Sequence, residues 1–120
     1  MNLVEEKIFQ IQTEKDFEET AMEVFQFQFQ HNPIYNKYCK LIDRKPEQVH
    51  SIQQIPFLPI EFFKQHRIYC HNSNPDLEFY SSGTTGSNRS IHYVADKSMY
   101  EKSFRKTFNI FYGSPEQYCI

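Results

Sequence analysis

One ten-residue segment concentrates the side chains that could bind a charged ligand. It holds two of the three glycines and six hydroxyl side chains, in the order Ser81-Ser82-Gly83-Thr84-Thr85-Gly86-Ser87-Asn88-Arg89-Ser90. Glycines let successive backbone N–H groups turn toward one anion, and Ser and Thr hydroxyls donate further hydrogen bonds. Arg89 adds a permanent positive charge whose fork geometry suits phosphate. The segment therefore predicts a loop that binds a polyphosphate; a flexible hairpin turn rich in small residues is the alternative.

Two widespread phosphate-binding motifs are absent from the sequence. The P-loop requires GxxxxGK followed by Ser or Thr, and the dinucleotide-binding turn requires GxGxxG. The predicted phosphate-binding loop therefore belongs to neither the P-loop class nor the dinucleotide-binding class.

The residues around this loop predict two short strands and a helix. Strand character is found from Leu77 to Tyr80 and from Ser90 to Val94, and a further strand is predicted from Arg67 to Cys70. Asp96 can cap a following helix, and Gly113 is predicted to end it in a left-handed conformation. The loop is thus expected to join two strands, with a helix after the second.

Residues 1–66 are predicted to be mainly helical. Asn2 is expected to start a first helix, and Thr13 with Asp16 three residues later is typical of the start of a second. The Asn32-Pro33 dipeptide should end that helix, because proline disfavours helical backbone at the preceding residue. A third short helix is expected after it, and Pro59 fits the first turn of a fourth. The fold class expected for the whole chain is mixed α/β.

Composition excludes several classes of protein. The chain has 120 residues, of which 17% are aromatic, and a formal net charge of −2. So many aromatic residues argue against disorder, and the charge argues against a protein that coats nucleic acid. No apolar run approaches the roughly 20 residues of a membrane span, and residues 1–10 are not a targeting signal. We therefore expect a cytoplasmic location.

The cysteines and histidines do not form a metal-binding pattern. Cys39, Cys70 and Cys119 are widely spaced, and Cys70 is adjacent to His71 without a second ligand pair nearby. Zinc sites usually draw on regularly spaced pairs, and an odd number of cysteines does not indicate a disulfide framework. We interpret the cysteines as packed thiols and the histidines as surface imidazoles.

Two segments together resemble a known family. Ser81-Ser82-Gly83-Thr84-Thr85-Gly86 resembles the phosphate-binding signature of the adenylate-forming enzymes, which usually continues x-Pro-Lys; here Asn88 stands at the proline and Arg89 at the lysine. The segment Ile55-Pro56-Phe57-Leu58-Pro59-Ile60-Glu61-Phe62-Phe63-Lys64 is similar to the acyl-protein synthetase (LuxE) branch, which is related to phenylacetate-CoA ligase. The resemblance covers most of the chain.

The resemblance implies an ATP- and Mg²⁺-dependent activation of a carboxylate. A fatty acid or other carboxylate attacks the α-phosphate of ATP, and a thiol then accepts the acyl group. The residues implied in binding the ATP phosphates are Ser81, Ser82, Gly83, Thr84, Thr85, Gly86 and Arg89. In acyl-protein synthetases the acceptor is a protein cysteine, which passes the acyl group to a fatty-acid reductase; in the related ligases it is coenzyme A.

The resemblance also implies that this chain is the N-terminal part of a longer domain. The family's adenine-contacting motif, ribose-binding aspartate, catalytic lysine and acyl-accepting cysteine lie farther along, so no catalytic residue is assigned here, and the chain alone is expected to be inactive. An apparent strand beginning at Tyr118 and the broad apolar face of the last helix support this interpretation. A non-enzymatic helical interaction module is the alternative, and exposed aromatic faces suggest self-association as a hypothesis.

Overall fold

The second helix begins where the local sequence provides capping groups, whereas Asn2, the predicted start of the first helix, lies outside the described residues. A computed structural model describes residues 3–83 and 89–118. Helix α1 spans Leu3–Ile8 and helix α2 spans Glu14–His31. The Thr13 hydroxyl accepts a hydrogen bond from the Asp16 backbone N–H at 3.1 Å, and the Asp16 carboxylate accepts one from the Thr13 N–H at 2.9 Å. This capping box confirms the predicted start of α2.

A second cap separates α2 from helix α3, which spans Pro33–Leu41. The Asn32 side chain accepts a hydrogen bond from the Tyr35 N–H at 3.2 Å, and Pro33 occupies the first turn, where its missing N–H costs nothing. Two short 3-10 turns follow, η1 at Pro46–Gln48 and η2 at Ile52–Gln54. The predicted break before Pro33 and the third helix are confirmed.

The small core lies between α2, α3 and the segment after them. Its buried members are Phe25, Tyr35, Cys39 and Val49. The Tyr35 ring meets the Phe25 ring edge-on, with centroids 6.1 Å apart. The Tyr35 hydroxyl also donates a hydrogen bond to the Pro56 carbonyl at 2.7 Å, which fastens the proline-rich segment to α3.

The proline-rich segment leads into helix α4, Phe62–Gln65, and then to a two-stranded sheet. Strands β1, Leu77–Tyr80, and β2, Ile91–Val94, pair antiparallel, with Leu77 opposite Val94 and Tyr80 opposite Ile91. The strand predicted from Arg67 to Cys70 is wrong: this segment belongs to no sheet within the described residues. Its side chains pack instead against neighbouring rings, and a strand without a hydrogen-bonded partner does not form a ladder.

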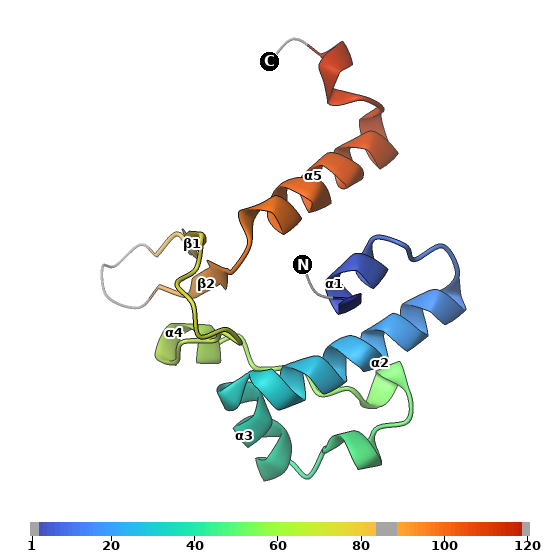
Figure 1. Ribbon diagram of the computed structural model, residues 1–120. Coiled ribbons are helices and arrows are strands. Elements are labelled where there is room, and N and C mark those ends of the chain that lie inside the picture. The colour runs from blue at the N-terminus through green and yellow to red at the C-terminus, as the bar shows by residue number, and fades with distance from the viewer. Residues whose placement is uncertain (1–2, 84–88, 119–120) are drawn as a thin grey trace.

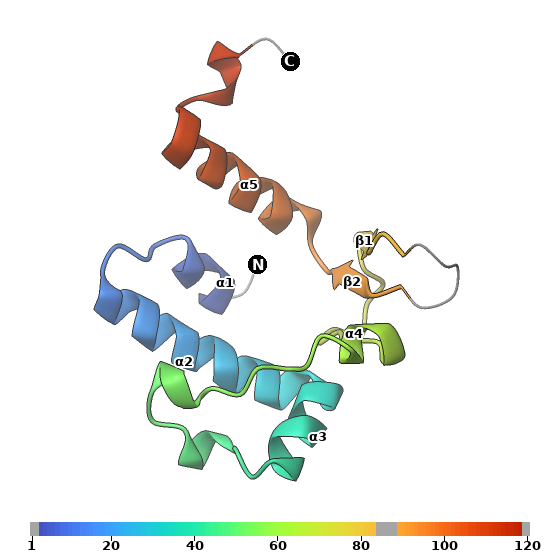
Figure 2. The same ribbon diagram turned by 180° about the vertical axis from the view of Figure 1, so that it is seen from behind.

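Helix α5, Lys97–Tyr112, projects away from the helical layer made by α1, α2 and α3 (Figures 1 and 2). The Asp96 side chain caps it by accepting from the Ser98 N–H at 2.8 Å. Gly113 ends it as predicted, at φ 79° and ψ −162°, a positive-φ conformation outside the left-handed helical region that was expected. A last 3-10 turn, η3, spans Pro115–Gln117. Tyr118 lies in no strand, and residues 119–120 lie outside the described part.

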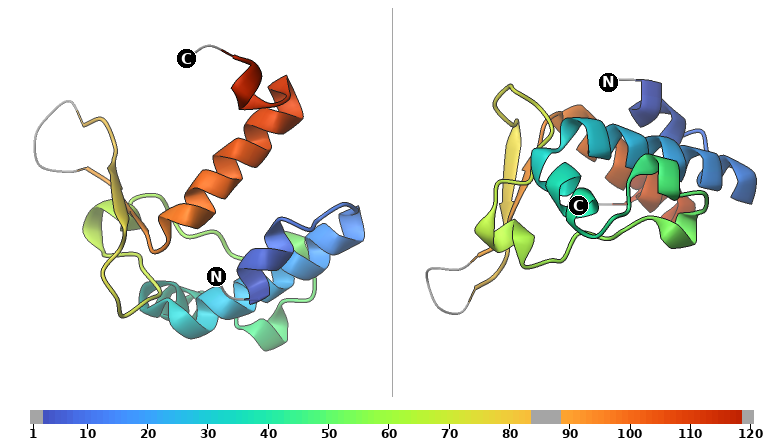
Figure 3. Two further views of the ribbon diagram at one scale, coloured as in Figure 1. Left: turned by 45° about the horizontal axis from the view of Figure 1, so that its top comes forward. Right: turned by 90° about the horizontal axis from the view of Figure 1, so that it is seen from below.

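The arrangement is open on one side (Figure 3). The radius of gyration is 16.6 Å, whereas a compact domain of this length should have about 13.6 Å. No residue of α5 is buried. The fold is therefore a mixed class of helices with a small antiparallel sheet. Within the described residues, no helix is long and apolar enough to cross a membrane.

Candidate functional site

The base of the glycine-rich loop is closed by a reciprocal pair of hydrogen bonds. The loop connects β1 to β2, as predicted. The Ser81 N–H donates to the Ser90 carbonyl at 3.0 Å, and the Ser90 N–H donates to the Ser81 Oγ at 3.0 Å. Ser90 is only 5% exposed. The Ser81 hydroxyl therefore acts as an acceptor in the loop base.

The two described ends of the loop also meet through Gly83 and Arg89. A Cβ atom added to Gly83 would lie 3.1 Å from the Arg89 Cγ. Because Gly83 has no side chain, the aliphatic part of the Arg89 side chain can lie against it. Ser82 and Arg89 are exposed and can reach a ligand from solvent. The predicted site residues Thr84, Thr85 and Gly86 lie outside the described residues.

A hydrogen-bonded pair of side chains, Tyr80 and Glu78, lies next to the loop on strand β1. The Tyr80 hydroxyl donates a hydrogen bond to the Glu78 carboxylate at 2.6 Å. This bond and the charge of Glu78 raise the pKa of Tyr80, because both favour its neutral form. Tyr80 is thus held as a neutral hydrogen-bond donor to Glu78, one residue before the loop begins.

The proline-rich segment positions strand β2. Phe63, at the start of α4, stacks on the His92 ring of β2 with centroids 4.6 Å apart and planes 23° apart. The neighbouring Phe62 meets the Tyr38 ring of α3 edge-on, with centroids 5.5 Å apart. Helix α4 therefore connects the helical layer to the strand that carries the second end of the loop.

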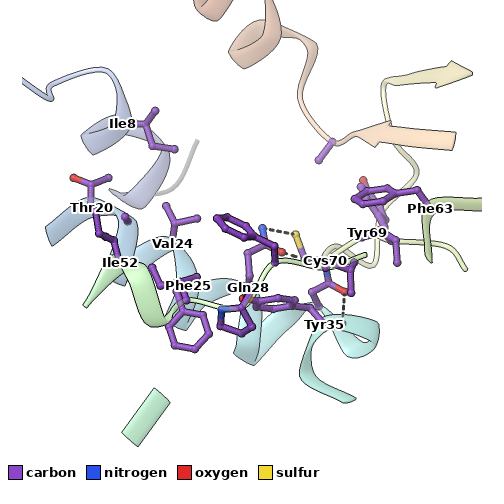
Figure 4. A pocket seen from close by; sticks show the side chains of 18 of the residues that line it. Ile8, Thr20, Val24, Phe25, Gln28, Tyr35, Ile52, Phe63, Tyr69 and Cys70 are labelled. Atoms are coloured by element: carbon purple, nitrogen blue, oxygen red, sulfur yellow. Dashed lines mark hydrogen bonds between the residues drawn. The ribbon is translucent and has the colours of Figure 1, made fainter. Parts of the chain in front are cut away.

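A large apolar groove, which the sequence did not predict, borders the same strand. We call it the α2 groove. It has a volume of about 840 Å³ and is formed by segments that are far apart in the sequence (Figure 4). Its lining residues are mostly apolar and include Ile8, Val24, Phe25, Ile52, Ile68 and Tyr93; the polar ones are Thr20, Gln28, Asn32, Gln53 and His71. In the sequence, Phe27 and Phe29 fall outside the helical stripe that contains Phe17, Ala21 and Val24, which indicates that α2 is apolar on more than one side.

Few polar groups interrupt this lining. The Gln28 side-chain nitrogen lies 3.9 Å from the Cys70 sulfur, and burial raises the pKa of the Cys70 thiol. The Tyr69 hydroxyl oxygen is buried and has no hydrogen-bond partner among the described residues. At one end of the groove, the Arg67 guanidinium lies over the Tyr69 and Tyr93 rings, 5.4 and 4.8 Å from their centroids. A positive charge therefore lies at the rim of an apolar groove.

The described cysteines do not have the environment of reactive thiols. Cys39 is fully buried, and burial raises the pKa of its thiol, as it does that of Cys70. A reactive cysteine needs a lowered pKa and access to its partner. The interpretation as a packed thiol is confirmed for Cys39, whereas Cys70 is partly buried and lines the α2 groove. Among the described residues, no group of three or more His, Cys, Asp or Glu side chains is placed to hold a metal ion.

Comparison with protein families identifies the class. The loop whose sequence resembles the phosphate-binding signature of adenylate-forming enzymes connects β1 to β2, is closed at its base, and follows the helical layer in the chain. The family model for the LuxE acyl-protein synthetases matches residues 7–108, which is most of the chain. The chain therefore belongs to the LuxE acyl-protein synthetase family. Neither the curated proteins nor the solved structures yield a match.

Proposed function

We propose that the chain is the N-terminal portion of an ATP-dependent acyl-protein synthetase that acts on a fatty acid. The observation that carries this proposal is the family match over residues 7–108. The open packing of α5, with no buried residue, supports the view that further structure completes the domain. The product acyl group would pass to a protein cysteine and then to a reductase that forms the aldehyde.

The chemistry proceeds in two balanced steps. A carboxylate oxygen of the fatty acid attacks the α-phosphorus of ATP; the new P–O bond forms as the bond to pyrophosphate breaks, leaving acyl-adenylate. A thiolate then attacks the acyl carbon, and AMP leaves with the oxygen that it shared with the acyl group. Negative charge builds on the departing pyrophosphate, so fixed donors around it lower the barrier.

We assign the loop residues to that pyrophosphate. The hydroxyls of Ser82, Thr84 and Thr85 and the backbone N–H groups of Gly83 and Gly86 would donate to its β- and γ-oxygens. Arg89 fits the same role, because its side chain is exposed at the loop and crosses Gly83. Ser81 would hold the loop in shape, since its Oγ already accepts the Ser90 N–H.

Mg²⁺ would be bound mainly through the oxygens of the nucleotide. The described residues offer no cluster of acidic or imidazole ligands for a cation, whereas the loop offers hydroxyl oxygens. When bound, Mg²⁺ neutralises part of the charge on the phosphates. The role of the loop residues is then to orient the phosphate chain.

ATP–pyrophosphate exchange tests this proposal. The open reading frame that encodes these 120 residues is expressed in full, and exchange is measured with and without dodecanoate. Thr85→Val should reduce the fatty-acid-dependent exchange about 10²- to 10³-fold, as for the loss of one oxyanion donor. The matched control is Thr107→Val, because the Thr107 hydroxyl donates a hydrogen bond to the Ser103 carbonyl of its own helix, at 2.9 Å, and lies on α5 away from the loop.

An unchanged exchange rate in Thr85→Val would refute the assignment of the loop. The acceptor is identified separately by incubating the protein with labelled dodecanoate and ATP. Hydroxylamine-sensitive label on the protein supports an acyl-protein synthetase, whereas label found only on added coenzyme A would overturn it in favour of a ligase.

A further inference from the structure

We propose that the α2 groove binds the hydrocarbon chain of the carboxylate substrate. This inference rests on the proposed function and specifies where its substrate lies. The volume of about 840 Å³ falls within the roughly 300–1,000 Å³ typical of small-molecule sites. The lining is apolar over most of its surface, as a hydrocarbon chain requires.

The groove runs toward the glycine-rich loop. Tyr93 and Ala95 line it, and the Tyr93 ring lies beside Tyr69, with centroids 5.9 Å apart. Tyr93, on β2, is three residues from Ser90 at the loop base. At about 3.3 Å per residue, that separation is about 10 Å. A substrate whose tail lies over α2 could therefore place its head group between the groove and the phosphate loop.

Arg67 supplies charge complementarity at that same end. Its guanidinium lies over Tyr69 and Tyr93, both of which line the groove. Within residues 3–83 and 89–118, no carboxylate forms an ion pair with Arg67. The buried Tyr69 hydroxyl would reach a ligand only if its ring turned, so we assign recognition of the carboxylate to Arg67. Figure 4 shows Tyr69 and Phe63 at this end, Cys70 beside Gln28 near the middle, and Ile8 and Thr20 at the other end.

Helix α5 is not suited to fill the groove. It contacts the turn that follows α1 through Lys102 and Lys106, whose ammonium groups lie 4.5 and 5.9 Å from the centroid of the Phe9 ring, and Lys106 also donates to the Phe9 carbonyl. Two lysines on the approaching side would have to lose their hydration in an apolar site, which is costly. An elongated amphiphile with a carboxylate head fits the groove and its rim better.

Equilibrium dialysis of the 120-residue chain against labelled hexanoate, octanoate and decanoate tests the proposal without ATP. Each methylene that enters the groove should strengthen binding about fourfold, so decanoate should bind about 15-fold more tightly than octanoate. Arg67→Gln should weaken decanoate binding and leave 1-decanol binding unchanged. Binding that is independent of chain length, or equal loss for the acid and the alcohol, would overturn the proposal.

Two α2 variants locate the site. Ala21→Leu adds bulk inside the groove and should weaken decanoate binding at least tenfold, whereas Gln26→Leu adds the same side chain on an exposed position of the same helix. Circular dichroism checks that both variants fold. Methyl NMR of the unsubstituted chain provides a second test: decanoate should shift Ile8 and Val24, which line the groove, and not Ile110, which is 70% exposed on α5. Shifts at Ile110 alone would refute the location.

These results are separable from those on adenylation. If fatty acids bind with the expected dependence on chain length but no ATP–pyrophosphate exchange occurs, the groove remains the assigned binding site and the proposed function is rejected. If Ala21→Leu leaves the fatty-acid-dependent ATP–pyrophosphate exchange unchanged, the proposed function stands and the groove is rejected as the site of the hydrocarbon chain.

Discussion

The hydroxyl of Ser81 is expected to hold the glycine-rich loop closed rather than to bind phosphate directly. Its Oγ accepts the Ser90 N–H at 3.0 Å, and Ser90 is 5% exposed. Ser81→Ala keeps the backbone bond from the Ser81 N–H to the Ser90 carbonyl but leaves the Ser90 N–H without an acceptor. A buried donor without a partner costs about 1–3 kcal/mol.

Amide hydrogen exchange measures this cost at the affected bond. A loss of about 1–3 kcal/mol should speed exchange of the Ser90 amide about 5- to 150-fold in Ser81→Ala. Ser81→Thr retains an Oγ acceptor and should keep most of the protection. Ser82→Ala is the matched control, because Ser82 is an exposed neighbour that lies outside this pair of bonds.

The outcome also decides between two roles for Ser81. If the Ser90 amide exchanges at the same rate in Ser81→Ala and in the unsubstituted chain, the hydroxyl does not close the loop and the reasoning is refuted. If exchange rises in Ser81→Thr as much as in Ser81→Ala, the effect is steric and the assigned hydrogen bond is not its cause.

Four further predictions concern the scaffold. Tyr35→Phe removes the 2.7 Å bond to the Pro56 carbonyl and should lower the free energy of unfolding by about 1 kcal/mol, measured by urea denaturation; no change would contradict that bond. Thr13→Ala should cost about 1 kcal/mol by the same assay and Thr13→Ser much less, since serine preserves the cap. Hydrogen bonds from Gln12 and Thr13 lower the pKa of Asp16 below its usual 3.8. The contribution of Asp16 to the free energy of unfolding is therefore complete above pH 3.8 and is lost as the pH falls through the lowered pKa. Asp16→Asn should reduce this loss of stability at acid pH in urea denaturation. Cys39, 0% exposed with its pKa raised by burial, should react with iodoacetamide at pH 7 only after unfolding, and rapid native-state labelling would exclude the packed position.

Features that depend on neighbouring residues were predictable from the sequence. The capping box of Thr13 and Asp16, the break before Pro33, the Asp96 cap and the helix end at Gly113 each depend on a few consecutive residues. The two strands that flank the loop were also predicted correctly. The expected strand at Arg67–Cys70 was wrong, because strand formation depends on a partner that local pattern does not reveal.

The family and the candidate phosphate loop were readable from sequence alone, because both depend on consecutive residues whose order is informative. Only the tertiary structure decided what surrounds that loop. The Ser81–Ser90 closure depends on the register of two strands, and the α2 groove collects residues from α1, α2, η2, the Ile68–His71 segment and β2. Register and cavities arise from contacts between distant segments, and a cavity is a volume that packing leaves unfilled. Helical periodicity showed that α2 is apolar on more than one side, and the fold determined which of those sides remained open.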